Sequence, residues 1–153
     1  MPTTLKPGDV APSFKGQVTD GSTVSLKDYK GKKNLVLYFY PMDNTPGCTR
    51  EARAFRDAAK RLNDHGTAVV GVSTQSVDSH KRFAANNELP FPLLSDAEKK
   101  VSTAYGVLKG NGKTAERATF LIDKKGKIRR VWPKVSITGH TDEIVSAIDE
   151  LEL

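Results

Sequence analysis

Cysteine is the scarcest chemically reactive residue in this sequence, with Cys48 the single example in 153 residues. That scarcity excludes an internal disulfide, a Cys-x-x-Cys redox pair and any metal site that needs two thiolates. The three histidines show no metal-ligand spacing, and no glycine-rich loop suits a phosphate group. The sequence therefore indicates neither a metal nor another cofactor, and the free thiol predicts a reducing, cytoplasmic setting.

Long apolar runs are also missing. No stretch approaches the roughly 20 apolar residues that a membrane-spanning helix needs, and residues 1–6 lack the pattern of a secretory signal. The formal charge of +6 and the pI of about 9.4 raise the question of nucleic acid binding. The lysines and arginines are nevertheless scattered among acidic residues. We therefore expect a solvated exterior, with no membrane contact and no nucleic acid partner.

The apolar segment at residues 35–40, LVLYFY, predicts a central strand. It is apolar on both sides, as is typical of a strand in a sheet that is covered on both faces. A second buried strand is expected at residues 67–73. Between the two, apolar or small residues recur every three or four positions over residues 46–65, which predicts a helix. Pro46 suits the first turn of that helix, and Gly66 ends it.

The rest of the chain alternates strand and helix patterns in the same way. The dipeptide Asp20-Gly21 favours a hairpin turn between strands at 13–18 and 23–26. We therefore predict one α/β domain over residues 1–153, with a central mixed sheet flanked by helices. The remaining predicted elements are a helix over 76–86, an edge strand or extended loop at 90–94, a helix over 97–105, a hairpin of 118–123 and 127–132, and a helix over 141–151.

The surroundings of Cys48 decide whether it is a nucleophile, because a lone cysteine is often only a small buried hydrophobe. The predicted helix places Cys48 in a first turn, where backbone N–H groups favour an anion and hence a thiolate. Thr45 alone would be an ordinary N-cap, but its hydroxyl can reach the sulfur or a substrate atom beside it. Pro41 and Pro46 stiffen the loop and shield the sulfur from water. Glu51, one turn on, can hold an arginine through a bidentate pair.

These residues carry a resemblance to a known family. The spacing Pro41-x-x-x-Thr45-x-x-Cys48 resembles the active-site motif of the peroxiredoxins. The surrounding segment is similar to one subfamily, the bacterioferritin comigratory protein or peroxiredoxin Q group, through Tyr38-Phe39-Tyr40-Pro41-x-Asp43-x-Thr45-Pro46-Gly47-Cys48-Thr49-x-Glu51. Further similarity runs along the whole chain, in Gly8-Asp9-x-Ala11-Pro12-x-Phe14, Leu26-x-Asp28, Gly71-Val72-Ser73, Phe91-x-Leu93-Leu94-Ser95-Asp96, Arg117-x-Thr119-Phe120-Leu121-Ile122-Asp123 and His140.

The resemblance implies a thioredoxin-like fold with an N-terminal β-hairpin extension, and a thiol-dependent peroxidase that serves antioxidant defence. By that similarity, Cys48 attacks hydrogen peroxide or an organic hydroperoxide and becomes a sulfenic acid. Arg117, by itself an ordinary arginine before a strand, would stabilise the thiolate and the charge that develops as the O–O bond breaks. The residues expected to contact substrate are Pro41, Thr45 and Arg117, and those expected to support the site are Tyr40, Glu51 and Trp132.

The sequence departs from this family in the second cysteine, which resolves the sulfenic acid. In most members it lies where this chain has Arg53, and in others near the position of Ala84. Both positions lack cysteine, so the sequence predicts a 1-Cys type that depends on an external thiol. Thioredoxin, glutaredoxin and a small thiol all stay open as that reductant. Arg53 is expected to add positive potential near the sulfur.

Other functions are compatible with the same thiol. One alternative is a redox sensor or relay, which would pass its oxidation to a partner protein through a mixed disulfide. A weaker alternative is a holdase chaperone surface, whose activity would not depend on Cys48. The peroxidase reading predicts catalytic consumption of peroxide with a thiol donor. For its assembly we expect a monomer or a weak dimer.

Structural positions are expected for two tyrosines and three histidines. Tyr38 and Tyr40 differ by two positions, so they share one face of the sheet. His140 is expected to be structural, at the start of the last helix. His65 and His80 are expected at the surface.

Overall fold

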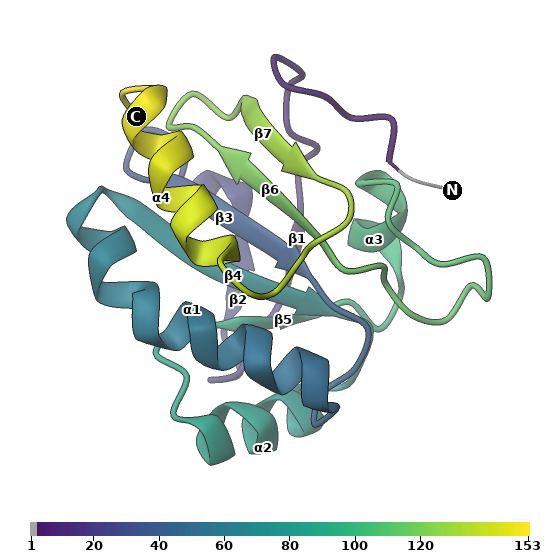
Figure 1. The fold of residues 1–153 in the computed structure, drawn as a ribbon. Helices are drawn as coiled ribbons and strands as arrows, with labels where there is room; N and C mark the ends of the chain where they lie inside the picture. Colours follow the sequence, from purple (N-terminus) through teal and green to yellow (C-terminus); the bar gives the residue numbers. More distant parts are fainter. Residues whose placement is uncertain (1–2) are drawn as a thin grey trace.

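The structure is a computed structural model that describes residues 3–153 (Figure 1). Its centre is a mixed sheet with the strand order β5-β4-β3-β6-β7. β3, β4 and β5 are parallel, whereas β6 and β7 run antiparallel to the strands beside them. The strands are β3 (Asn34–Phe39), β4 (Thr67–Ser73), β5 (Leu93–Ser95), β6 (Ala118–Ile122) and β7 (Ile128–Trp132).

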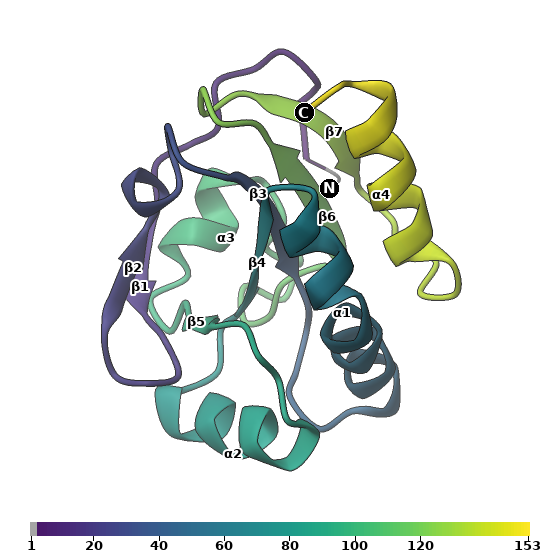
Figure 2. The same ribbon diagram turned by 90° about the vertical axis from the view of Figure 1, so that its left-hand side faces the viewer.

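Helices and a small hairpin cover the two faces of this sheet (Figure 2). α1 and α4 lie on one face, and α3 and the hairpin β1-β2 lie on the other, with α2 beside the β5 edge. The arrangement is a mixed sheet flanked by helices with an N-terminal hairpin, as predicted. The covering elements are β1 (Lys15–Gln17), β2 (Thr23–Ser25), a 3-10 turn at Leu26–Asp28, α1 (Pro46–Asp64), α2 (Val77–Asn87), α3 (Lys100–Ala104) and α4 (His140–Glu150).

β3 is the middle strand of the sheet, and all six of its residues are buried. Leu35, Leu37 and Phe39 point into the core beneath the hairpin and α3. Val36 and Tyr38 point into the core beneath α1 and α4, and Tyr40, just past the strand, joins them. The continuous apolar run of the sequence therefore reflects burial on both faces. The two tyrosine rings share a face as expected, with ring centroids 5.6 Å apart.

α3 is shorter than the sequence pattern predicted. The expected helix over 97–105 begins only at Lys100, because Lys99 adopts a left-handed conformation with φ 63°. The buried Asp96 side chain then accepts hydrogen bonds from the backbone N–H groups of Val101 and Ser102. These two bonds satisfy donors that a helix start leaves free. The periodicity showed that a helix was present but did not reveal this turn.

Candidate active site

Cys48 lies in the first turn of α1, directly after the loop that leaves β3. Thr45 takes the N-cap position in an extended conformation, and Pro46 is the first helical residue, as the sequence predicted. The Cys48 side chain points into the core beneath α1, and the residue is only 2% exposed. The sulfur is therefore held at a helix start, where the local backbone field favours an anion.

Arg117 reaches this cysteine from a distant part of the chain. It directly precedes β6, whose antiparallel pairing with β3 sets Ala118 opposite Phe39. The sheet register therefore delivers Arg117 to the end of β3 where α1 begins. Its Nη2 donates a hydrogen bond to Cys48 Sγ at 3.3 Å. A guanidinium at this distance stabilises negative charge on the sulfur.

Glu51 holds the other side of the same guanidinium. Arg117 Nη1 donates to Glu51 Oε1 at 2.8 Å, and the glutamate is only 2% exposed. The expected bidentate pair is therefore wrong, because the two ends of the guanidinium contact two different partners. The resulting geometry places one rigid, planar cation between a carboxylate and the sulfur.

Burial dominates the ionisation of Glu51. Desolvation raises the pKa of this carboxyl to about 7, although the charge and the hydrogen bond of Arg117 oppose the shift. Within residues 3–153, Glu51 Oε2 accepts no hydrogen bond, which leaves half of the carboxylate without compensation. Burial also disfavours the charged form of Arg117, but Glu51 and Cys48 together raise the arginine's pKa above its ordinary value. Arg117 therefore stays charged while Glu51 titrates near neutrality.

Gly47 allows the close approach of Arg117. A Cβ atom at this position would lie 3.2 Å from Arg117 Nη2 and 3.7 Å from the side chain of Ile137. The first distance is tighter than ordinary van der Waals contact. A side chain at the position before Cys48 would therefore require the guanidinium to shift by a few tenths of an ångström.

The remaining expected site residues divide into two groups. Thr45 and Pro41 lie in the loop before α1, where the Thr45 hydroxyl donates to the Met42 carbonyl at 3.1 Å rather than capping the helix. Trp132 is half-buried at the end of β7 and packs edge-on against the buried His140, with ring centroids 5.3 Å apart. His140 in turn hydrogen-bonds Thr119 Oγ1 at 2.9 Å. Trp132 and His140 therefore pack together on the face of the sheet that α1 and α4 cover.

Arg53 does not point to the sulfur as the sequence suggested. Its Nε donates to Asn87 Oδ1 at 2.8 Å, at the end of α2. Arg56 donates to the Asn87 backbone carbonyl at 3.1 Å. Both arginines therefore join α1 to α2, because these positions of α1 face its neighbouring helix. Ala84, the other expected position of a resolving cysteine, lies half-buried on α2.

Sequence reasoning missed a buried polar cluster beneath the loop before α1. The expectation that His80 lies at the surface is wrong, since its side chain and that of Asp43 are both 0% exposed. Tyr40, expected to support the site, donates to Asp43 Oδ1 at 2.6 Å. A usable signal did exist, because His80, Phe83 and Asn87 share the spacing of one helix face, and all three are buried.

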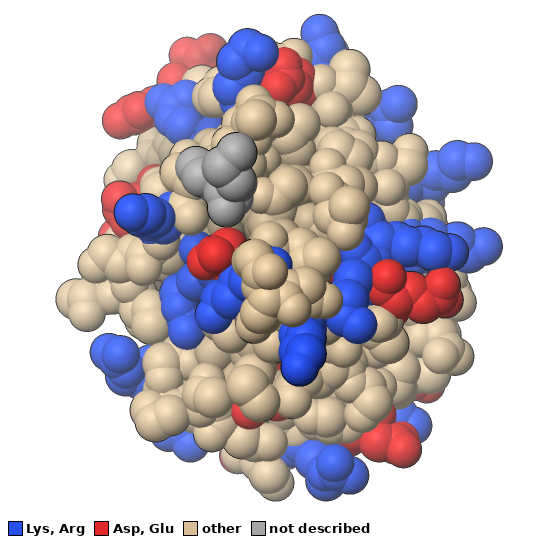
Figure 3. Space-filling view, turned by 90° about the vertical axis from the view of Figure 1, so that its right-hand side faces the viewer, with Lys and Arg blue, Asp and Glu red and all other residues tan. Residues whose placement is uncertain are grey.

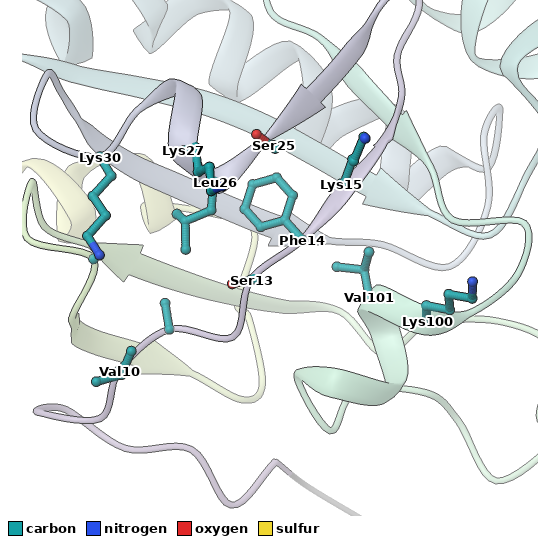
Figure 4. Close-up of a pocket in the computed structure, with 12 residues that line it drawn as sticks. Val10, Ser13, Phe14, Lys15, Ser25, Leu26, Lys27, Lys30, Lys100 and Val101 are labelled. Carbon is teal, nitrogen blue, oxygen red and sulfur yellow. The ribbon is translucent and has the colours of Figure 1, made fainter.

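A cavity of about 830 Å³ lies elsewhere, beside the N-terminal hairpin (Figure 4). Phe14, Leu26 and Val101 form apolar parts of its wall, and none of the candidate site residues lines it.

In the described part of the chain, the surface shows no single-sign patch on the face drawn in Figure 3, where acidic side chains lie among the lysines and arginines. Within residues 3–153, no helix is long and apolar enough to cross a membrane. The same residues contain no group of three His, Cys, Asp or Glu side chains suited to a metal ion.

Comparisons with known proteins agree on one family. Residues 7–131 match the model of the AhpC/TSA family. A putative peroxiredoxin bcp of Coxiella burnetii is 45% identical, over 94% of this chain and 99% of that protein. The crystal structure of peroxidoxin BcpB from Mycobacterium tuberculosis has a TM-score of 0.90 and 34% identity, over 96% of this chain and 98% of that one. A Xanthomonas campestris bacterioferritin comigratory protein, studied for its alkyl peroxide reduction activity, has a TM-score of 0.85 and 34% identity, with 92% of both chains covered.

Proposed function

This chain belongs to the AhpC/TSA family and is a thiol-dependent peroxidase of the peroxiredoxin Q group, and we propose that Cys48 carries its chemistry. The contact of Arg117 with both Cys48 Sγ and Glu51 is the observation that supports this assignment most strongly. A buried cysteine that only filled space in the core would not need a cation beside its sulfur. A thiol that reacts as a thiolate needs such a neighbour.

In the first step the Cys48 thiolate attacks one oxygen of the hydroperoxide. A sulfur–oxygen bond forms as the O–O bond breaks, so the sulfur is oxidised to a sulfenic acid and the peroxide is reduced. The departing oxygen takes the electron pair of the broken bond and a proton, and leaves as water or an alcohol. Arg117, already in contact with the sulfur, would stabilise the negative charge that moves onto the oxygens.

Thr45 and Pro41 would complete the substrate site from the loop side. Thr45 directly precedes α1, and its hydroxyl donates to the Met42 carbonyl. If the side chain rotated, the hydroxyl would release that carbonyl and donate to a peroxide oxygen instead. Pro41 would restrict water around the sulfenic acid. Tyr40, Glu51 and Trp132 would act indirectly, Glu51 by fixing the guanidinium and the two aromatic residues by packing and hydrogen bonding.

An external thiol would complete the cycle, because the chain has no second cysteine. The first thiol attacks the sulfenic sulfur, releases water and forms a mixed disulfide with Cys48. A second thiol then attacks that disulfide and restores the Cys48 thiolate. The enzyme would thus be of the 1-Cys type, with thioredoxin, glutaredoxin or a small thiol as donor.

Organic hydroperoxides are the substrates that we propose alongside hydrogen peroxide. The related X. campestris protein is described by its alkyl peroxide reduction activity. In this chain Met42, an apolar side chain in the loop before α1, is 44% exposed. Ile137 lies beside Gly47, close to the Arg117 guanidinium. Both could contact the alkyl part of a substrate.

The test is removal of the sulfur. We expect Cys48→Ser to abolish peroxide consumption, because a hydroxyl is far less nucleophilic than a thiolate. Consumption of tert-butyl hydroperoxide and of hydrogen peroxide would be followed with thioredoxin, glutaredoxin and glutathione as donors. Turnover by the serine variant would contradict the mechanism. A wild-type protein that reacts once, and turns over with none of the three donors, would favour the redox relay instead.

A further inference from the structure

The buried cluster beneath the active-site loop centres on His80 and Asp43. His80 Nδ1 lies 2.7 Å from Asp43 Oδ2, and His80 Nε2 lies 3.1 Å from the Leu94 carbonyl of β5. Ser79 donates to Asp43 Oδ2 at 2.7 Å, and Tyr40 donates to Asp43 Oδ1 at 2.6 Å. One carboxylate from the loop is therefore bound by Tyr40, which directly follows β3, and by two residues of α2.

The hydrogen bonds determine where the protons of this cluster lie. A carbonyl only accepts, so His80 Nε2 must carry a proton to bond the Leu94 oxygen. Asp43 already accepts from Ser79 and Tyr40, as an ionised carboxylate does. His80 Nδ1 lies within hydrogen-bond distance of the same carboxylate, so the imidazole ring links Asp43 to β5 through both of its nitrogens.

The electrostatics of Asp43 agree with this assignment. Burial opposes ionisation, but the hydrogen bonds from His80, Tyr40 and Ser79, together with the charge of His80, lower the pKa of Asp43 below its ordinary value. The titratable groups in contact with His80 are Asp43 from the loop and Tyr40, which directly follows β3. A fully buried pair of this kind has all its polar atoms satisfied, which is the condition for it to persist.

The position of Asp43 links this cluster to the reacting sulfur. Asp43 is in the short loop between β3 and α1, two residues before Thr45 and five before Cys48. Its backbone N–H also donates to the side chain of Gln75, between β4 and α2. Asn44, directly after it, has a left-handed conformation with φ 65°. The path of the chain into α1 is therefore fixed mainly at Asp43.

We propose that His80 is a positioning residue of the peroxidase, which fixes the loop before α1 through its buried hydrogen bond with Asp43 and so places Thr45 and Cys48 for attack. This inference rests on the proposed role of Cys48. His80 does not touch the substrate, and it acts from α2 through Asp43. Because small displacements of reacting groups slow a reaction strongly, loss of the pair should slow oxidation of Cys48 without unfolding the enzyme.

Two substitutions test the contacts of the two ring nitrogens of His80 one at a time. Asparagine places its amide nitrogen near the position of Nδ1, so His80→Asn keeps a donor for Asp43 and loses the Leu94 contact. Glutamine places its amide nitrogen near Nε2, so His80→Gln keeps the Leu94 contact and loses Asp43. Each variant leaves one buried group without its partner. His65→Gln, at the end of α1 and away from the loop, is the control.

Each variant would be mixed with hydrogen peroxide, and the second-order rate of Cys48 oxidation measured by rapid quenching. We expect His80→Gln to react about tenfold more slowly than wild type, and His80→Asn to stay within about threefold. Amide hydrogen exchange of residues 41–49 should increase in the glutamine variant and change little in the asparagine variant. If one variant fails to fold, Ser79→Ala removes a donor to Asp43 and should give an intermediate loss of rate.

Equal rates and equal exchange in wild type and both His80 variants would overturn the proposal. So would equal slowing of both variants, because that outcome would indicate only a general loss of packing. A wild-type protein whose Cys48 does not react with peroxide would instead refute the proposed function. In that case the exchange measurement still reports whether His80 fixes the loop.

Discussion

At the scale of single residues, the site depends on one guanidinium that serves two partners. Arg117 contacts Cys48 Sγ at 3.3 Å and Glu51 Oε1 at 2.8 Å through different nitrogens. A lysine could not reproduce this arrangement, since its single ammonium is not a planar fork. The buried carboxylate is thus the group that keeps the arginine directed at the sulfur.

Glu51 should make the stability of the protein depend on pH near neutrality. Burial raises its folded pKa to about 7, from 4.5 in the absence of the fold. The folded state therefore binds more protons between these values, and stability must fall as pH rises through that window. Relative to Glu51→Gln, wild type should lose about 3 kcal/mol of its free energy of unfolding between pH 4 and pH 8.

Urea unfolding of both proteins across this pH range would measure the shift. Comparing the difference between the two proteins removes the contributions of all other titrating groups. A difference that does not change with pH would show that Glu51 keeps an ordinary carboxyl pKa in the fold.

At the scale of elements, α2 is the helix on which sequence and structure differ most usefully. The predicted range of 76–86 lies within one residue of the observed helix at each end, and the Ser76 side chain caps the helix by accepting from Ser79 N–H. The buried His80 was missed, since its partner Asp43 lies 37 residues away and only the parallel pairing of β3 with β4 brings them together. Likewise, helix periodicity could not show that Arg53 of α1 faces Asn87.

α2 is also where a second cysteine can be introduced. We expect Ala84→Cys to form an intramolecular disulfide with Cys48 after one equivalent of peroxide, because the resemblance places a resolving cysteine near this position. Cys48 is buried beneath α1, so the reaction requires local unwinding of α1 or α2. The measurement is the count of free thiols, which should fall from two to zero, with a mass 2 Da below that of the reduced protein.

The neighbouring substitution Ala85→Cys is the matched control. Ala85 is exposed, on a different side of α2 from the half-buried Ala84. We expect this variant to accumulate sulfenic acid at Cys48 and to form the disulfide far more slowly. Equally fast closure in the two variants would mean that position 84 has no special access to the sulfur.

At the scale of the whole molecule, the sheet separates the side that holds the candidate site from the opposite side. Cys48, Tyr38 and Tyr40 belong to the core beneath α1 and α4, whereas the hairpin and α3 cover the other core. The fold class could be predicted from the sequence, because apolar runs and turn residues mark elements locally. The contact of Arg117 with Cys48 could be predicted only by resemblance, since it depends on how β6 pairs with β3.

Because of this separation, substitutions in the two cores should destabilise the protein to a similar extent but differ in their effect on Cys48 oxidation. Phe55 is fully buried in the core beneath α1, where its ring stacks on Tyr38 with centroids 4.4 Å apart. Phe14 is buried in the opposite core. Phe55→Leu and Phe14→Leu should each lower the free energy of unfolding by about 1–2 kcal/mol, since each removes buried ring atoms. Only Phe55→Leu should also slow Cys48 oxidation, because it loosens the face of α1 that carries the sulfur. Urea unfolding and the rate of oxidation by hydrogen peroxide would measure the two effects, and an equal loss of rate in both variants would contradict the separation.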